Sequence, residues 1–183
     1  MRTHETAGMG EVARRARRAS VRPAALGALA LWMLAVGPLA APARATEWGG
    51  IEPGISGKEH VRKRYGPATR EAAKKVEGYD TTEWIYEGAR APAGLIRMTV
   101  EFGLLGPDQQ YKPDVVRIVR LDPKPLVFPK PTIFDGWGPP DLEGKQNDRD
   151  MYVYRDGLVV IFDAEGIAAV TMFFTPPQPA PKP

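Results

Sequence analysis

Few side chains in this sequence could carry out covalent or metal chemistry. The chain has 183 residues with no Cys and two His, which excludes disulfides, thiolate nucleophiles and cysteine-based metal sites. After residue 45 the sole serine is Ser56 and the sole histidine is His60, so a hydroxyl–imidazole pair is the nucleophile to consider. Ser56 precedes Glu59 by three residues, the spacing of a helix capping box, and a capping hydroxyl is already bonded to the backbone. We therefore predict no catalysis. We expect Ser56→Ala and His60→Ala to remove no activity, and Ser56→Ala to cost about 1 kcal/mol of stability.

Acidic side chains occur in pairs that could bind a cation weakly. These pairs are Glu83 with Glu87, Asp148 with Asp150, and Asp163 with Glu165. The first pair flanks an aromatic strand, the others fall in polar loop or turn sequence, and no twelve-residue calcium loop is present. Glycine-rich phosphate-binding motifs are absent as well. The sequence therefore predicts no metal site and no cofactor, and it indicates that the protein is not an enzyme.

The first 45 residues have the order of a cleavable export signal. Arginines between Arg14 and Arg22 precede an apolar run, Ala24–Ala41, and the segment closes on the small-x-small triplet Ala43-Arg44-Ala45. A membrane anchor is the alternative, since a run of about 18 residues is near the lower limit for spanning a bilayer. The Gly-Pro breaker inside the run favours cleavage after Ala45. We predict an exported protein, located in the periplasm of a Gram-negative bacterium.

Removal of this leader changes the charge of the chain. The whole chain has 25 Lys and Arg against 22 Asp and Glu, for a net charge of +3. Residues 1–45 contain seven Arg and two Glu, so 18 basic and 20 acidic side chains remain and the net charge becomes −2. No basic stripe with interleaved aromatic residues is left, and the sequence therefore argues against nucleic-acid binding.

Residues 46–121 are predicted to contain one short helix and three strands. The helix begins at Gly57 and ends at Gly66-Pro67, because glycine suits the left-handed residue after a helix and proline forbids its continuation. Alternating apolar residues predict antiparallel strands with one buried face. These strands are residues 83–87, residues 96–102 with positions 96, 98, 100 and 102 facing the core, and residues 115–121. Thr69–Val76 fits a second helix or an extended arm, and Glu71 with Lys75 favours the helix slightly.

Residues 131–175 repeat this order after a proline-rich linker, 122–130. A helical turn over 131–137 is followed by Gly138-Pro139, which matches Gly66-Pro67. The further strands are residues 151–154, 158–162 and 167–174, and residues 176–183 form a proline-rich tail. We predict an α+β fold of tandem degenerate repeats, each a short helix followed by a three-stranded antiparallel sheet.

The first repeat resembles a known family. Gly54-Ile55-Ser56 before the helix, Val61 within it, Gly66-Pro67 at its end and the strand motif Trp84-x-Tyr86 are similar to the pattern of the SmpA/OmlA (BamE-like) family. Members are small periplasmic components of the outer-membrane β-barrel assembly machinery. The resemblance covers about residues 51–121, with a weaker copy over 131–174, and a tandem of such units also resembles the β-lactamase-inhibitor-protein architecture. The lipid-anchoring cysteine of the family is replaced here by Ala45-Thr46.

The resemblance implies a protein-binding module of the cell envelope related to outer-membrane assembly factors. We predict an envelope protein as partner, no nucleic acid, and at most peripheral contact with the outer membrane without a lipid anchor. The alternative is a small-ligand or cell-wall-carbohydrate binding protein that uses a cleft between the two units. We predict binding through the sheet surface or a free strand edge, with Trp84, Tyr86, Tyr152 and Tyr154 as the binding residues. The alternative for these aromatic residues is a place in the core. The predicted structural residues are Ser56, Glu59, Gly66, Pro67, Gly138 and Pro139.

Overall fold

A computed structural model describes residues 47–106 and 108–177, all within the unit Ala40–Pro183. The predicted export signal, 1–45, and most of the predicted tail lie outside the described residues. Within the described ranges no helix is both long enough and apolar enough to cross a membrane.

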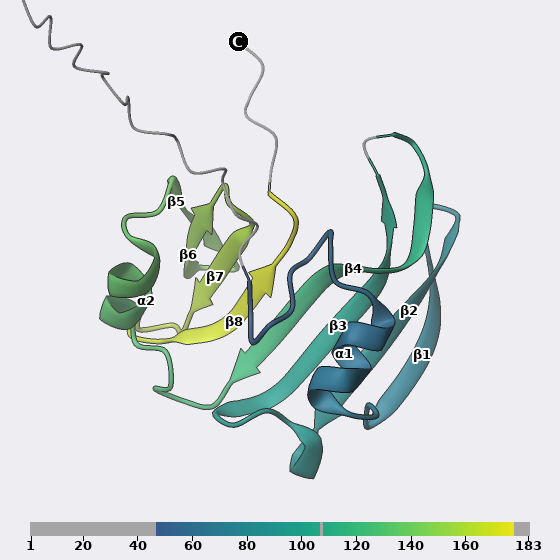
Figure 1. The fold of residues 1–183 in the computed structure, drawn as a ribbon. Coiled ribbons are helices and arrows are strands. Elements are labelled where there is room, and N and C mark those ends of the chain that lie inside the picture. Colours follow the sequence, from purple (N-terminus) through teal and green to yellow (C-terminus); the bar gives the residue numbers. More distant parts are fainter. Residues whose placement is uncertain (1–46, 107, 178–183) are drawn as a thin grey trace, which may run out of the picture. The chain divides into compact units, whose positions relative to one another are not determined.

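One antiparallel sheet organises the described residues (Figure 1). Its eight strands lie in the order β1-β2-β3-β4-β8-β7-β6-β5. The elements in chain order are α1 (Lys58–Tyr65), β1 (Arg70–Val76), β2 (Tyr79–Glu87), the 3-10 helix η1 (Gly88–Arg90), β3 (Leu95–Leu105), β4 (Tyr111–Pro123), α2 (Lys130–Trp137), β5 (Leu142–Gln146), β6 (Arg149–Tyr154), β7 (Leu158–Phe162) and β8 (Ala169–Phe174). We call α1 with β1–β4 the first half and α2 with β5–β8 the second half.

The predicted α+β tandem of three-stranded units is wrong. The protein is mostly sheet, with two short helices in the described residues, and β1 and β5 are the strands that the sequence pattern did not indicate. Thr69–Val76 holds strand β1, not a helix, because its residues pair with β2 from Arg70↔Ile85 to Val76↔Tyr79. Backbone pairing with a neighbouring strand thus outweighs the weak helical signal of Glu71 and Lys75.

Strand β5 has no apolar alternation from which it could be predicted. All five of its residues are exposed, and the strand is held by pairing with β6 from Leu142↔Val153 to Gln146↔Arg149. Asn147 and Asp148 connect the two strands with φ values of 50° and 64°. A two-residue connection with both φ values positive is the type I′ turn, whose twist matches that of paired strands.

The two halves are related by a local twofold axis between β4 and β8. These strands pair at Val119↔Phe174, Arg120↔Phe173 and Leu121↔Met172. Within the halves, Val119 pairs with Val100, and Met172 pairs with Val160. Val119 and Met172 therefore hold equivalent places, as do Leu121 and Phe174, and the axis passes between Arg120 and Phe173.

Equivalent contacts on both sides of the axis hold each helix against its strands. Tyr86 Oη donates a hydrogen bond to the carbonyl oxygen of Gly66 at 3.2 Å, and Tyr154 Oη does the same to Gly138 at 3.1 Å. The ring pairs Trp84–Phe102 and Tyr152–Phe162 have centroids 4.8 Å and 4.9 Å apart. The chain thus builds the same helix-to-sheet contact twice.

Both halves share one core, on the side of the sheet that carries the helices. Val61 of α1 and Ile133 of α2 are fully buried in the same apolar cluster as the inward residues of the strands. Trp48, near the start of the described residues, contacts Phe128 in the connection before α2 and Phe174 of the second half, with centroids 5.8 Å apart in each pair. A segment that precedes the first half therefore covers part of the second.

Two predictions about local structure need correction. Ser56 is not the helix cap: Gly57 is the N-cap, no side chain bonds there, and Ser56 Oγ accepts the Glu52 N–H at 2.9 Å, while Glu59 is exposed in the first turn. Ile96 does not face the core but is 56% exposed. The register of β3 shifts between Leu95 and Arg97, and such a bulge turns the extra residue out of the alternation.

Glycine-to-alanine substitution should change the stability in opposite directions at two nearby positions, the glycine that ends α2 and a glycine inside it. Gly138 has φ 76° and ψ −165°, and Gly66 is closely similar with φ 74° and ψ −163°; a methyl group at either position would meet open space. Gly138→Ala should cost about 1–3 kcal/mol, because this backbone region suits glycine alone. Gly136→Ala, inside α2 and equally unobstructed, should instead stabilise by about 0.5–1 kcal/mol. Urea unfolding of both variants checks this, and equal effects would contradict it.

Burial of Tyr86 generates a pH prediction. Burial raises the pKa of Tyr86 from 10.0 to about 12. The folded state then keeps a proton that the unfolded state has lost, so the stability from this group is complete below about pH 10 and is lost as the pH rises toward about 12. Tyr86→Phe should lose about 1 kcal/mol at neutral pH with its hydrogen bond and should show a shallower alkaline loss. Unfolding free energies across this range check it, and an unchanged slope would contradict the assignment.

Candidate binding surface

The aromatic residues predicted to bind a partner lie in the core. Trp84, Tyr86 and Tyr154 are at most 5% exposed, and Tyr152 packs against the core beside Phe162. All four face the helices, so they do not form an accessible surface, and the prediction is corrected on this point. They are residues that hold the fold together.

The opposite side of the sheet, which we call the open face, carries no helix. Strand register places one row of residues straight across it, because alternate residues of a strand share a face. From β1 to β5 through the axis this row is Arg70, Ile85, Thr99, Arg120, Phe173, Val159, Val153 and Leu142. This row is continuous over both halves, and within it Ile85 and Thr99 are buried.

The part of the open face in the first half is polar and ion-paired. The carboxylate of Asp122 accepts Arg97 Nε at 2.9 Å and Arg120 Nε at 3.0 Å, and Thr171 Oγ lies 3.4 Å from it across the axis. On the neighbouring row Arg117 pairs with Glu101. The Asp122 side chain is 12% exposed, so two guanidinium groups are fixed in place by a largely buried acid.

The part in the second half is apolar. Phe173, Val159 and Val153 of the row are joined on the same face by Ile161 and Met151, which pair with each other. All five are partly exposed, and Leu142 at the edge is 56% exposed. Equivalent core positions are filled alike in the two halves, whereas most equivalent positions of the open-face row differ: Thr99 corresponds to Val159, and Arg120 to Phe173. The exception is Ile85, which corresponds to Val153 and is buried.

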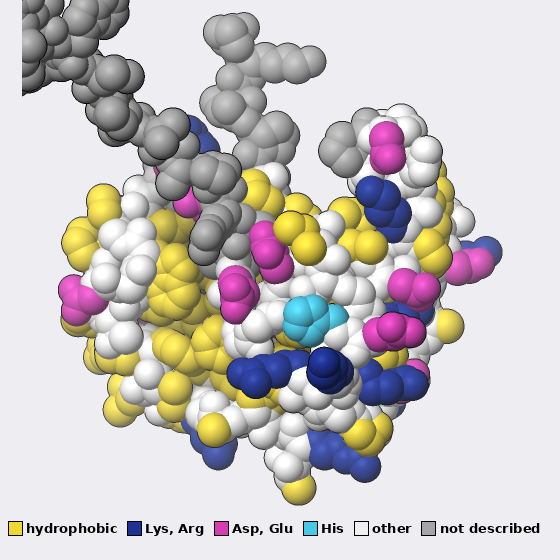
Figure 2. Space-filling view, in the orientation of Figure 1, with side chains coloured by type: hydrophobic (Ala, Val, Ile, Leu, Met, Phe, Trp, Pro, Cys, Tyr) yellow, Lys and Arg dark blue, Asp and Glu magenta, His cyan; other side chains and the backbone are white. Residues whose placement is uncertain are grey.

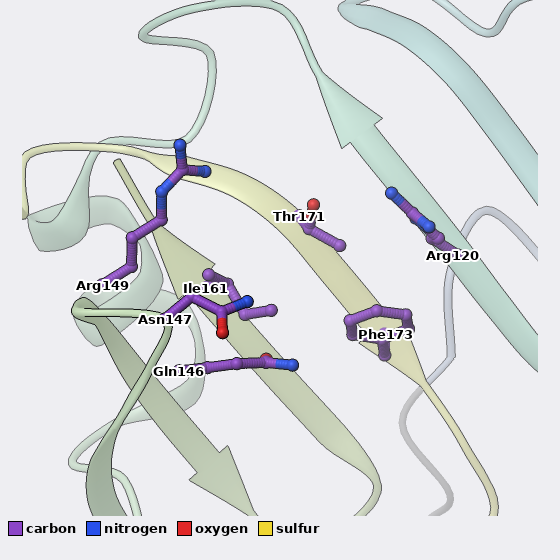
Figure 3. A pocket seen from close by; sticks show the side chains of 7 residues that line it. All are labelled: Arg120, Gln146, Asn147, Arg149, Ile161, Thr171 and Phe173. Atoms are coloured by element: carbon purple, nitrogen blue, oxygen red, sulfur yellow. The ribbon is translucent and has the colours of Figure 1, made fainter. Parts of the chain in front are cut away.

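A cavity of 420 Å³ lies on the open face where the two parts meet (Figure 3). Its lining comes from β4, the β5–β6 hairpin, β7 and β8. The lining residues are Arg120, Gln146, Asn147, Arg149, Ile161, Thr171 and Phe173. The Arg120 guanidinium lies over the Phe173 ring, 5.8 Å from its centroid, so the cavity combines cations and amides with an apolar base. This volume falls within the range of small-molecule pockets, about 300–1,000 Å³.

The helix side carries cations that serve the fold. Figure 2 shows Lys and Arg side chains gathered over α1. Lys58 pairs with Asp114 at 2.9 Å, Arg62 with Glu71 at 3.3 Å, and Arg64 donates to the carbonyl oxygen of Gly49. Among the residues that the structure describes, no group of His, Cys, Asp and Glu side chains is arranged to hold a metal ion.

Comparisons with known proteins leave the family open. No family model matches the chain, and no curated protein matches it. A solved structure with some similarity is that of a DUF4309 family protein, YjgB, from Bacillus subtilis, with a TM-score of 0.47 and 12% sequence identity. The match covers 73% of this chain and 88% of that chain.

Sequence reasoning missed the residues of the open face for identifiable reasons. Gln146, Asn147 and Arg149 look like polar loop sequence, and only the pairing of β5 with β6 brings them to the face. Val159 and Ile161 alternate with the core residues of a strand that is apolar throughout. One signal was available: every residue of Leu158–Phe162 is apolar, whereas a strand with one buried face needs an apolar residue only at alternate positions.

The acid at the centre of the polar part generates a prediction. Asp122→Asn removes a carboxylate that accepts hydrogen bonds from two guanidinium groups, so it should cost about 1–3 kcal/mol of stability. Asp135→Asn, on the exposed side of α2, should stay within about 0.5 kcal/mol of the wild type. Chemical denaturation of the two variants checks this. Equal stability of both would mean that the pairs around Asp122 are ordinary surface ion pairs.

Proposed function

We propose that this chain is an exported protein-binding module without catalytic activity, related to outer-membrane protein assembly factors, and that it binds its partner through the open face. The periplasm of a Gram-negative bacterium is its proposed location, and an envelope protein its proposed partner. The resemblance of residues 51–121 to the SmpA/OmlA pattern and the export-signal order of residues 1–45 support this setting.

The observation that carries the proposal is the difference between two otherwise equivalent halves. A duplicated scaffold needs equivalent core residues for stability, and Tyr86 and Tyr154 with their glycine partners show that equivalence. Stability does not require the open faces to differ. The open face is polar around Arg120 in one half and apolar around Val159 in the other. Such a face suits a partner whose surface is likewise divided into a polar and an apolar part.

The partner that fits is a folded protein with an apolar patch bordered by acidic side chains. The apolar part would pack against Val153, Val159 and Phe173, which lie on rigid strands and lose little entropy on binding. The cations Arg97 and Arg120 border this part and share one carboxylate, that of Asp122. Acidic side chains of a partner would meet the excess positive charge there, and complementary charge favours fast and selective association.

A second candidate function is binding of a small ligand or cell-wall carbohydrate. The cavity on the open face, lined by Arg120 of the first half and by residues of the second, favours it, since its amides and hydroxyl could bond to such a ligand. A thermal-shift screen with muropeptides and lipids separates the two: a saturable shift with one of these compounds, unaffected by a change at Val159, would favour the small ligand.

Substitution on the open face tests the proposed function. Val159→Glu places a charge in the apolar part and should abolish retention of an envelope partner while lowering stability by about 1 kcal/mol or less. Phe134→Glu makes a comparable change at a residue that is 48% exposed on α2, and it should retain the partner. Capture from envelope extracts, followed by titration with the purified partner, provides the readout.

The two variants together decide the outcome. Loss with Val159→Glu and retention with Phe134→Glu supports the open face. Retention by both, or loss by both with intact folding, contradicts it. Sedimentation of the chain alone shows whether the retained partner is a second copy, which would also contradict an envelope protein of another sequence.

A further inference from the structure

We propose that the cavity on the open face binds a peptide segment in which an acidic side chain stands beside an aromatic or large aliphatic one. The carboxylate would bind at Arg149, with Arg120 on the other side of Phe173 adding positive charge, and the apolar side chain would lie on Ile161 and Phe173. This rests on the proposed protein-binding function and specifies the chemistry that the partner presents at the centre of the open face.

Arg120 is held ready to bind an anion. Its Nε and one Nη lie 3.0 Å from the same oxygen of Asp122, and the guanidinium plane lies near the Phe173 ring. A guanidinium carries five N–H donors, so these contacts leave donors available to a ligand. The Arg120 side chain is 44% exposed, and Figure 3 shows it on the far side of Phe173 from the β5–β6 hairpin. A fixed, partly used guanidinium loses little freedom when it takes a second carboxylate.

Arg149 supplies a second cation from another element. It stands opposite Gln146 across the β5–β6 hairpin, at the type I′ turn. Among the described residues it forms no ion pair, in contrast to Arg97, Arg117 and Arg120. An arginine that the fold does not use, at the rim of a cavity, is a candidate for ligand recognition.

The charge balance favours an anion and the base of the cavity favours an apolar neighbour. Asp122 is shared between Arg97 and Arg120, and Arg149 adds a further positive charge, so the site has a cationic excess. Ile161 and Phe173 form its apolar part. The amides of Gln146 and Asn147 can both donate to and accept from peptide groups. This combination of an anion site, an apolar surface and amide side chains suits a peptide better than a free phosphate.

Short peptides test the site without the partner protein. The chain expressed from its full sequence in a Gram-negative host is titrated with N-acetyl-Glu-Phe-amide and followed by nuclear magnetic resonance. We expect saturable shifts centred on the amides of Asn147, Arg149 and Thr171. The neutral analogue N-acetyl-Gln-Phe-amide should bind at least about tenfold more weakly, because the charge-assisted bonds are lost. Higher salt should lower the affinity for the acidic peptide and leave the affinity for the neutral peptide unchanged.

Three variants make the assignment specific. Arg149→Gln removes an exposed cation that supports no ion pair in the described structure, and it should weaken the acidic peptide about tenfold or more. Arg149→Lys keeps the positive charge but lacks the planar guanidinium, and its affinity for the acidic peptide should lie between those of the wild type and Arg149→Gln. Lys63→Gln removes one charge from the exposed side of α1 and should bind like the wild type. Unchanged unfolding midpoints would show that all three are folded.

Each result supports or overturns the inference. Equal affinity for the acidic and neutral peptides, no loss with Arg149→Gln, or equal saturation by inorganic phosphate at the same concentration would overturn it. A failure of the proposed function gives a different pattern. The Val159→Glu variant would still retain the partner, while the peptide titration would still show preference for the acidic peptide and its loss with Arg149→Gln. In the reverse result, Val159→Glu would abolish retention of the partner, Arg149→Gln would not affect it, and neither peptide would bind. That result would support the proposed function and overturn the inference about the cavity.

Discussion

The structure depends on the pairing of β4 with β8. Three register pairs centred on Arg120↔Phe173 join two four-stranded halves into one sheet. Without this pairing each half would expose a long strand edge, which invites association with other chains. With it, Val119 and Leu121 on one strand and Met172 and Phe174 on the other become the centre of a single core. The edges that remain are β1 and β5, which are rich in charged or polar exposed residues.

The same pairing determines where function can lie. It places both helices on one side of the sheet and leaves the other side without a helix across all eight strands. On the helix side the two halves repeat their contacts, as the Tyr86–Gly66 and Tyr154–Gly138 hydrogen bonds show. On the open side they diverge. Where a duplicated scaffold keeps one side alike and varies the other, the side that varies is the natural place to look for recognition, and the cavity lies at the boundary of the two parts.

The sequence was informative where hydrophobic alternation or a helix-ending glycine defines an element. Residues 83–87 and 158–162 lie within strands β2 and β7, and both helices end just before Gly66 and Gly138. It was uninformative where pairing alone makes the strand, as in β5, and it misplaced Ile96 because a bulge cannot be read from alternation. The sequence pattern also did not identify the binding surface, because an aromatic-x-aromatic strand motif does not say which face of a sheet the helices cover. That depends on long-range register, which a single sequence does not encode in short patterns.

Amide hydrogen exchange at the junction tests the central claim most directly. If β4 and β8 form the middle of one cooperative sheet, hydrogen-bonded amides within Val119–Leu121 and Met172–Phe174 will exchange only by global unfolding, at the free energy measured by denaturant. The amides of both halves will then share one unfolding transition. Fast exchange at the junction, together with separate unfolding of the halves, would show two independent units and would contradict a continuous open face.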